Sequence, residues 1–212
     1  MNMYLSDNNP ENENQFDRKY QSPYHVLKTL ADIPNEEWLE FQAICSPRAY
    51  QKNDYFAESG KETELIGYCI SGLFRLYYET SEGEDYNKSF CAENEFISSY
   101  SSLLLSSPSI LSIQALEPSE LIVFRYTDWI NIQERHICWE RIGRKLAEAA
   151  FIKKEGRERK LLLQSAKINY QNFLEEYPNL HERIPLYHIA SYLGITSVAL
   201  SRIRRKIAEK KS

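Results

Sequence analysis

The sequence contains no run of about eighteen apolar residues, the length that a membrane-spanning helix needs. Its first thirty residues are polar and acidic, and they lack the basic start and apolar stretch of a secretory signal. Glycine is scarce, with 7 residues in 212, and none of them belongs to a phosphate-cradling loop. We therefore expect a cytoplasmic protein without a membrane partner.

Cysteine and histidine are also few, and their spacing indicates no site chemistry. The four cysteines, Cys45, Cys69, Cys91 and Cys138, form no CxxC pair, and the four histidines form no HExxH pair. No GxSxG elbow or other pairing of nucleophile and base is present. The sequence therefore predicts no metal site, no cofactor and no enzymatic activity. Four reduced thiols packed as small apolar groups are the favoured interpretation, and a redox-sensing thiol is the alternative.

The composition is that of a globular protein, with 42% hydrophobic, 13% aromatic and 26% charged residues. A chain of 212 residues can hold two modest domains. Its net charge of -4 is unevenly distributed, because residues 183–212 carry seven arginine or lysine residues and one glutamate, a net +6, which leaves -10 for the rest. An acidic body with one basic end favours docking on DNA through that end, although a solvated basic tail gives the same charge.

The first two thirds of the chain divide into segments of different pattern. Residues 1–22 are rich in Asn, Asp, Glu and Gln and are expected to form a flexible leader. Residues 23–45 have the spacing of short helices broken at Pro34. Short β-like runs with turn signals such as Ser71-Gly72 between them predict an antiparallel β sandwich or roll. These runs cover residues 65–70, 73–78, 85–91, 111–116 and 120–126.

A helical pattern begins near Thr127 and lasts to the end of the sequence, with breaks near Gly156, Pro178 and Gly194. In its first part, apolar side chains recur at spacings of three and four residues with charged residues between them. Such a stripe either packs against its own β domain or pairs with its copy in a homodimer. The expected dimer residues are Ile137, Ile142, Leu146, Ala149 and Ala150.

Residues 185–207 have the pattern of two helices joined by a tight turn. Gly194 is suited to end the first helix in the left-handed conformation, and Thr196 is a candidate N-cap for the second. The small side chain of Ala190 leaves room for the two helices to cross closely. The other residues expected on the buried faces are Leu186, Ile189, Leu193, Leu200, Ile203 and Ile207.

The opposite face of the second helix is suited to enter the major groove of double-stranded DNA. Arg202 is the leading residue for base readout, because its planar fork can bond guanine at two points. The other candidates for base readout are Ser197, Val198 and Ser201, and those for phosphate contact are Thr196 at the helix start, Arg204, Arg205 and Lys206. A plain helical hairpin with a solvated basic face is the alternative.

The stretch from Ile189 to Arg202, IASYLGITSVALSR, resembles the IAxxLGxTxExxSR sequence of the Crp/Fnr family of bacterial transcription regulators. Weaker similarity lies in YCISGLFR at 68–75 and FLEEYP at 173–178. The resemblance implies an α+β fold with an N-terminal antiparallel β roll of the double-stranded β-helix or jelly-roll type, a long dimerisation helix and a C-terminal helix-turn-helix. The corresponding domains are a sensor at 23–135, a dimerisation helix at 136–156 and a DNA-binding domain at 157–212.

The chain departs from this family's pattern in three places. Val198 stands where many relatives have a base-reading glutamate, and little sequence follows the recognition helix to form a wing. Where relatives that bind cyclic nucleotides have a Gly-Glu pair and a later arginine, this chain has Ser98 and Ser99 and no arginine. Residues 76–124 carry eight acidic residues and one lysine, so cyclic AMP, an anion, is disfavoured as the effector.

The serine-rich stretch at 98–112 either lines a pocket for a neutral effector or is a degenerate loop. Its candidate pocket residues are Phe96, Ser98, Ser99, Tyr100, Ser109 and Ser112. The favoured function is a homodimeric transcription regulator that reads a palindromic operator through the helix at 196–208. An unknown small-molecule effector and RNA polymerase are further candidate partners. The alternative is a ligand-binding signalling module whose C-terminal helices contact a protein.

Overall fold

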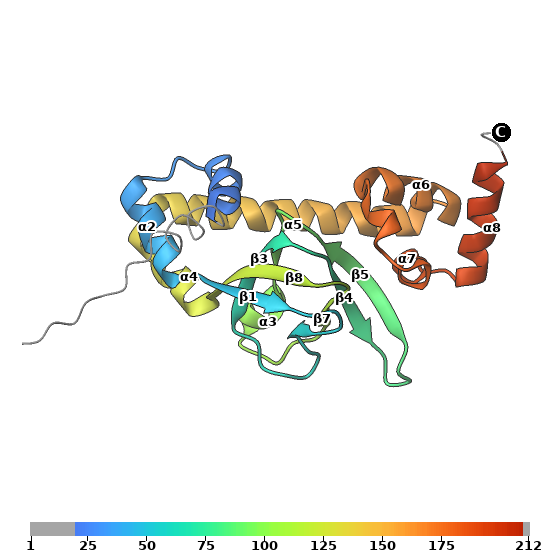
Figure 1. The fold of residues 1–212 in the computed structure, drawn as a ribbon, viewed down its shortest axis with the longest axis horizontal. Helices are drawn as coiled ribbons and strands as arrows, with labels where there is room; N and C mark the ends of the chain where they lie inside the picture. The colour runs from blue at the N-terminus through green and yellow to red at the C-terminus, as the bar shows by residue number, and fades with distance from the viewer. Residues whose placement is uncertain (1–19, 210–212) are drawn as a thin grey trace, which may run out of the picture.

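The computed structural model describes residues 20–209, which form a β roll beneath one long helix, with a group of shorter helices at each end of that helix (Figure 1). The roll has two antiparallel four-stranded sheets, in the orders β1-β8-β3-β6 and β2-β7-β4-β5. Its strands are β1 (Ser46–Tyr50), β2 (Tyr55–Ala57), β3 (Leu65–Ser71), β4 (Phe74–Glu79), β5 (Asp85–Cys91), β6 (Phe96–Ile97), β7 (Ser112–Ala115) and β8 (Ser119–Arg125). The predicted α+β fold with an antiparallel β roll is confirmed.

Some strands of the roll are apolar on both faces, because one face packs against the other sheet and the other face packs against helices. Between the sheets lies an apolar core that includes Cys69, Phe74 and Ile113, each fully buried. The outer face of the sheet containing β8 carries Ile122 and Phe124, which pack against helices instead. This double coverage explains why the sequence shows continuous apolar runs here, since strict alternation requires one solvated face.

The turn between β3 and β4 requires glycine at position 72. Gly72 has a φ of +105°, and a Cβ at this position would lie 2.6 Å from the Cα of Ser119. The Ser119 hydroxyl instead accepts a hydrogen bond from the backbone N–H of Leu73 at 3.2 Å. The Ser71-Gly72 turn predicted from the sequence is therefore a point of close contact between two strands.

The N-terminal helices pack against the beginning of the long helix. A helix over residues 20–28 precedes α2 (Asn35–Ile44), which follows the predicted break at Pro34. Phe41 stacks on Trp139 with ring centroids 5.1 Å apart, and the Trp139 indole donates to Glu37 at 2.9 Å. Residues 1–19 of the expected flexible leader lie outside the described residues. Residues 20–22 are helical and Tyr20 is buried, so the leader cannot extend to residue 22 as expected.

The long helix, α5 (Ile137–Leu163), is continuous over 27 residues, a length of about 40 Å. It follows α4 (Tyr126–Arg135), whose start agrees with the helix expected near Thr127. The break expected near Gly156 is absent, so the boundary predicted at 156 is wrong by seven residues. The reason is that one glycine inside a helix lowers its stability by only about 1 kcal/mol, which the rest of α5 can offset.

The C-terminal helices are α6 (Ala166–Glu176), a short 3-10 turn η1 (Leu180–Glu182), α7 (Leu186–Tyr192) and α8 (Ser197–Ala208). They stand at the far end of α5 from the N-terminal helices (Figure 1). Within residues 20–209 no strand follows β8, so α8 is not followed by a wing in the described chain. The remaining short helix, α3 (Tyr100–Leu105), lies between β6 and β7. No helix in the described part of the chain is long and apolar enough to cross a membrane.

All four cysteines are buried free thiols. Burial raises the pKa of Cys69 to about 12, with a further contribution from Glu93. A protonated buried thiol is a poor nucleophile, so the arrangement agrees with the favoured interpretation of cysteines as apolar packing groups.

Candidate DNA-binding site

Helices α7 and α8 meet in a tight turn of the helix-turn-helix type. Gly194 takes the left-handed conformation with a φ of +67°, and the Ile195 N–H donates to the Ala190 carbonyl at 3.0 Å. Thr196 caps α8, because its hydroxyl accepts from the Ala199 N–H at 3.2 Å. Ala190 is buried at the crossing of the two helices, as expected from its small side chain. The turn therefore fixes the angle at which α8 leaves the body of the protein.

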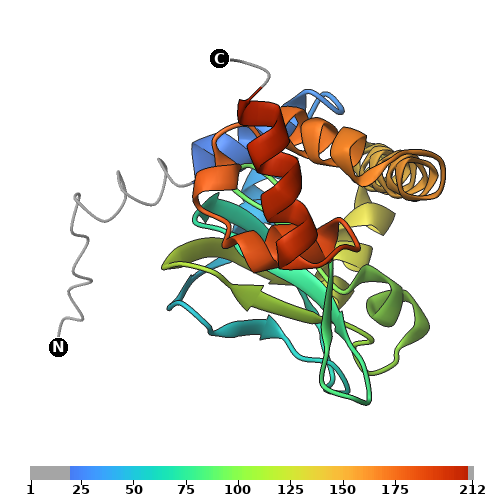
Figure 2. The same ribbon diagram turned by 90° about the vertical axis from the view of Figure 1, so that its right-hand side faces the viewer.

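The outer face of α8 is exposed, and its inner face is held by the core. Leu200 is 1% exposed, whereas Val198 at the same end of the helix is 61% exposed. Every residue that the sequence analysis assigned to DNA contact is exposed in the structure: Thr196, Ser197, Val198, Ser201, Arg202, Arg204, Arg205 and Lys206. Figure 2 looks onto this end of the molecule and shows α8 in front of the other helices, with its outer side uncovered.

The charge on this face is available to a polyanion. Arg205 pairs with Glu209 at 3.6 Å, a weak and exposed contact that a phosphate can replace. No carboxylate of the described residues forms a salt bridge with Arg202, Arg204 or Lys206. Arginine side chains free of carboxylates can form bidentate hydrogen bonds to base edges or to phosphate. The exposed face of α8 thus has the chemistry of a DNA-reading surface.

An aromatic cluster joins the helix-turn-helix to the β roll. Phe90 of β5 contacts Phe173 and Tyr177 of the α6 region and Tyr192 of α7, with ring centroids between 5.6 and 6.2 Å apart. Leu73 and Phe90 on the roll share one buried core with Ile189 and Leu200. Helices α6 to α8 therefore do not form a separate body in this structure, since their core is completed by the outer surface of the sheet.

A buried polar network lies beside these rings. Arg75 of β4 is 7% exposed, donates to Asp85 at 2.7 Å and to Gln114 at 2.8 and 3.0 Å, and reaches Nδ1 of His188 at 3.4 Å. Asn87 of β5 donates to the same His188 nitrogen at 3.2 Å. Two donors on one nitrogen require it to be an unprotonated acceptor. Burial, with the charge of Arg75 adding to it, lowers the pKa of His188 to about 4.

A second polar contact holds the segment before α7. Arg183 donates to Glu93 at 2.8 and 3.1 Å, and it also bonds Glu117. Burial raises the pKa of Glu93, but the hydrogen bonds from Arg183 and from backbone amides outweigh it and hold that pKa below its ordinary value. Both carboxylates belong to loops of the roll, so this arginine ties the C-terminal unit to the roll.

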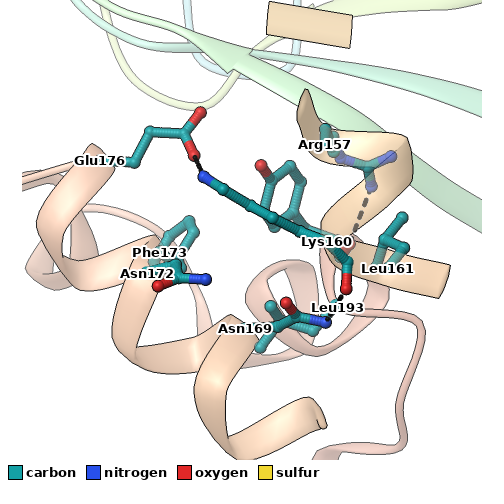
Figure 3. A pocket seen from close by; sticks show the side chains of 9 residues that line it. Arg157, Lys160, Leu161, Asn169, Asn172, Phe173, Glu176 and Leu193 are labelled. Atoms are coloured by element: carbon teal, nitrogen blue, oxygen red, sulfur yellow. Dashed lines mark hydrogen bonds and ion pairs between the residues drawn. The ribbon is translucent and has the colours of Figure 1, made fainter. Parts of the chain in front are cut away.

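Helix α5 contacts both units at its C-terminal end (Figure 3). Arg157 donates to the carbonyls of Asn87 at 3.2 Å and of Tyr192 at 2.8 Å. Lys160 pairs with Glu176 of α6 at 3.3 Å, and its carbonyl accepts from Asn169 at 3.2 Å. One helix thus makes hydrogen bonds to β5, α6 and α7, which fixes the position of the helix-turn-helix relative to the roll.

Sequence reasoning missed these three linking residues, Arg75, Arg157 and Arg183. The only signal for Arg75 in the sequence was its place inside an otherwise apolar strand. A charge buried there needs polar partners, so such an arginine indicates a polar contact. The partners of all three come from distant parts of the chain: His188 lies 113 positions after Arg75. Spacing within one segment could not reveal such contacts.

The expected effector residues gather around α3, but their polar groups bond to each other. The Ser109 hydroxyl donates to the Leu111 carbonyl at 2.6 Å and lies 2.9 Å from the Ser99 hydroxyl, which is hydrogen-bonded to Ser102 at 3.1 Å. Ser112 accepts from a backbone N–H, that of Ser59, at 3.0 Å. Of the remaining candidates, Phe96 packs on Tyr68, Ser98 is half-buried and Tyr100 is 41% exposed. The hydroxyls act here as structural hydrogen-bonding groups.

The expected dimer residues do not share one face of α5. Ile142 is fully buried in the core that the chain itself forms with its N-terminal helices, and Leu146 packs against the same core. The assignment of Ile142 was therefore wrong, because the N-terminal segment covers that side of the helix, and Leu146 is only partly available to a partner. Ile137, Ala149 and Ala150 are exposed. Phe151 and Leu162 are 65% and 76% exposed, and the sequence analysis omitted both. They lie about half a turn around α5 from Lys153, which pairs with Glu95 of the roll, and so on the side away from the roll.

Comparison with known proteins identifies the architecture. No protein-family model matches the sequence, and no curated protein matches it. FixK2 from Bradyrhizobium japonicum matches in structure with a TM-score of 0.70 at 16% identity, over 79% of this chain and 86% of that one. The c-di-GMP-responsive global regulator CLP from Xanthomonas campestris gives 0.66 at 14% identity, over 84% and 93%. A regulator assigned to the Crp/Fnr family from Eubacterium rectale gives 0.65 at 16% identity, over 84% and 85%. The chain therefore has the fold of the Crp/Fnr transcriptional regulators.

Proposed function

We propose that the protein is a DNA-binding transcription regulator that reads its operator through the outer face of α8. The observation that carries this proposal is a capped recognition-type helix whose inner face is buried and whose outer face exposes Arg202 and Arg204, neither of which forms a salt bridge with another described residue. The fold supports it, because it is the fold of proteins described as regulators, among them CLP, which is linked to virulence gene expression. A hydrolytic or transfer function has no comparable group of side chains to support it.

The roles of individual residues follow from their position along α8. Side chains in its first two turns, Val198, Ser201 and Arg202, point to the base edges, and Arg202 provides a bidentate contact to guanine. Arg204, Arg205 and Lys206 face the phosphates on either side of the groove. Val198 offers an apolar contact, such as one to a thymine methyl group, where relatives with a glutamate accept a hydrogen bond.

The regulator acts as a homodimer formed along the exposed part of α5 that faces away from the roll. This side carries Phe151 and Leu162. Figure 1 shows no other element opposite the roll along the middle of α5. A two-fold dimer would present two α8 helices to a palindromic site, with half-sites about 34 Å apart, one turn of DNA. The β roll is then the sensor. The acidic stretch at 76–124 makes cyclic AMP a poor effector for the usual pocket.

Selection of random duplex DNA by the full-length protein tests this proposal. We expect a two-fold motif, an affinity that falls steeply with salt, and in Arg202→Ala a loss of preference at one base pair per half-site. That variant should bind the selected site about tenfold or more weakly, since a bidentate base contact is worth about 1–3 kcal/mol. Arg125→Ala removes an exposed arginine from the roll and is the charge-matched control.

Two results would contradict the proposal. One is enrichment of no motif by the wild-type protein at any salt concentration. The other is a motif that Arg202→Ala and Arg125→Ala retain equally, which would separate α8 from base readout. In the first case, a signalling module whose C-terminal helices contact a protein partner would become the better interpretation.

A further inference from the structure

A cleft of about 230 Å³ opens where the β4–β5 hairpin, the end of α5 and the α7–α8 turn meet. This is a different place from the serine-rich region around α3 (Figure 1). Its lining comes from both units: Tyr78, Tyr86, Asn87 and Lys88 from the hairpin, Arg157 and Leu161 from α5, and Ser191, Tyr192 and Gly194 from the helix-turn-helix. One water needs about 10–15 Å³ of such space, so a small molecule of on the order of ten non-hydrogen atoms has room.

No carboxylate lines the cleft, and its cations form no salt bridge within the described residues. Lys88 and Arg157 line it, and Lys154 is close enough to repel Lys88. Burial first, and then the neighbouring Lys154 and Arg157, lower the pKa of Lys88 below its ordinary value. None of the three forms a salt bridge, although the chain as a whole is acidic. An unbalanced group of three cations favours a dianion over a neutral molecule.

Polar atoms in the lining also lack partners. Asn87 is 2% exposed, and its Oδ1 is buried without a hydrogen-bond partner. The Nε of Arg157 is buried and unpaired as well, although its Nη2 donates to two carbonyls. Buried polar atoms without partners are uncommon in folded proteins. Of the two, only the Nε–H of Arg157 is a donor that an anion could accept from, whereas the Asn87 oxygen is an acceptor and belongs to the buried network around His188.

The remaining surface of the cleft is aromatic and apolar. The ammonium of Lys88 lies 5.9 Å from the ring centre of Tyr78, and the guanidinium of Arg157 lies 4.5 Å from that of Tyr192. Tyr86, on the rim, donates its hydroxyl to Glu84 at 3.0 Å, so its ring is held beside the opening. Flat rings and an arginine plane are the surfaces on which an aromatic ligand stacks.

We propose that this cleft binds an aromatic monophosphate, with the phosphate between Lys88 and Arg157 and the ring against the tyrosines. The binding itself does not depend on DNA recognition. Its regulatory consequence rests on the proposed function: a ligand that bridges the hairpin and the α7–α8 turn favours the conformation in which the helix-turn-helix is docked on the roll.

Calorimetric titration of the full-length protein with phenyl phosphate, in the absence of DNA, tests the proposal. We expect a dissociation constant of about 1 mM or below, and at least tenfold weaker binding for benzyl alcohol and for inorganic phosphate. Lys88→Gln should weaken binding of phenyl phosphate about tenfold through loss of one charge-assisted contact. Lys61→Gln, at an exposed salt bridge elsewhere on the roll, changes the net charge equally and should bind as the wild type does.

Other outcomes overturn the inference. Absence of binding, equal binding of inorganic phosphate, or equal weakening in Lys61→Gln would each do so. If Lys88→Gln weakens only DNA binding, the cleft holds the DNA backbone instead of a small molecule. Should Lys88→Gln not fold, Lys154→Gln on the exposed side of α5 replaces it, with about threefold weakening expected. Because the titration contains no DNA, its failure is distinct from failure of operator selection.

Discussion

His188 makes the contact between the β roll and the helix-turn-helix sensitive to pH. Its pKa is lowered from 6.5 to about 4, so between these values the unfolded chain takes up a proton that the folded chain does not. Stability from this group is therefore complete above pH 6.5 and is lost as the pH falls toward 4. The loss amounts to up to about 3 kcal/mol in the free energy of unfolding.

Urea unfolding at several pH values, compared between the wild type and His188→Asn, measures this effect. The asparagine carbonyl can accept from Arg75 and Asn87 but cannot be protonated, so the variant should lose about 2–3 kcal/mol less than the wild type between pH 7 and pH 4.5. The carboxylates titrate equally in both proteins, so their contribution to the pH dependence of the free energy of unfolding cancels in the comparison. Parallel pH profiles would mean that His188 is protonated, or exposed, in the folded state.

Some residues of the candidate site could be predicted from the sequence, and others could not. The face of α8 was predictable because Gly194, Thr196 and Ala190 define the turn within a few positions, and the turn fixes which side faces outward. His188 and Asn87 were not predictable as partners, because 101 positions separate them and only the docking of two units brings them together.

At the scale of elements, Gly156 shows that a residue's preference can be overridden by the helix around it. The sequence analysis placed a break here, yet α5 continues through it. A Cβ at Gly156 would have nothing within 4 Å, so the glycine serves no close contact. Gly156→Ala should therefore raise the free energy of unfolding by up to about 1 kcal/mol, or Tm by about 2–4 °C.

Thermal unfolding measures this change, and Gly143→Ala in the same helix is the control. A Cβ at Gly143 would collide with the amide of Gln133, which donates to the Trp139 carbonyl at 3.5 Å, so no gain is expected there. A loss of stability in Gly156→Ala would contradict the account.

Some of the strands could not be predicted from the sequence. β1 is mainly exposed and β6 has only two residues, and the main-chain pairing that forms them leaves little pattern in the sequence.

At the scale of the whole molecule, the proposed function requires a dimer, because two copies of α8 must reach a palindromic site. The side of α5 away from the roll exposes Phe151 and Leu162, and apolar side chains of this size on one helix face favour burial against a second copy. The N-terminal helices already occupy the opposite side through Ile142, which leaves the outer side for the partner.

Phe151→Glu should therefore give a monomer in sedimentation equilibrium at concentrations where the wild type is a dimer, raising the dimer dissociation constant at least tenfold. A like charge facing its copy across a two-fold axis is repelled, and the apolar contact is lost as well. The same variant should bind a single half-site normally but lose preference for the palindrome, because α8 itself is unchanged. Leu39→Glu, at a side chain 64% exposed on α2, is the matched control and should remain dimeric. A Phe151→Glu protein that stays dimeric and still selects the palindrome would place the dimer contact elsewhere, with the two α8 helices brought together by another surface.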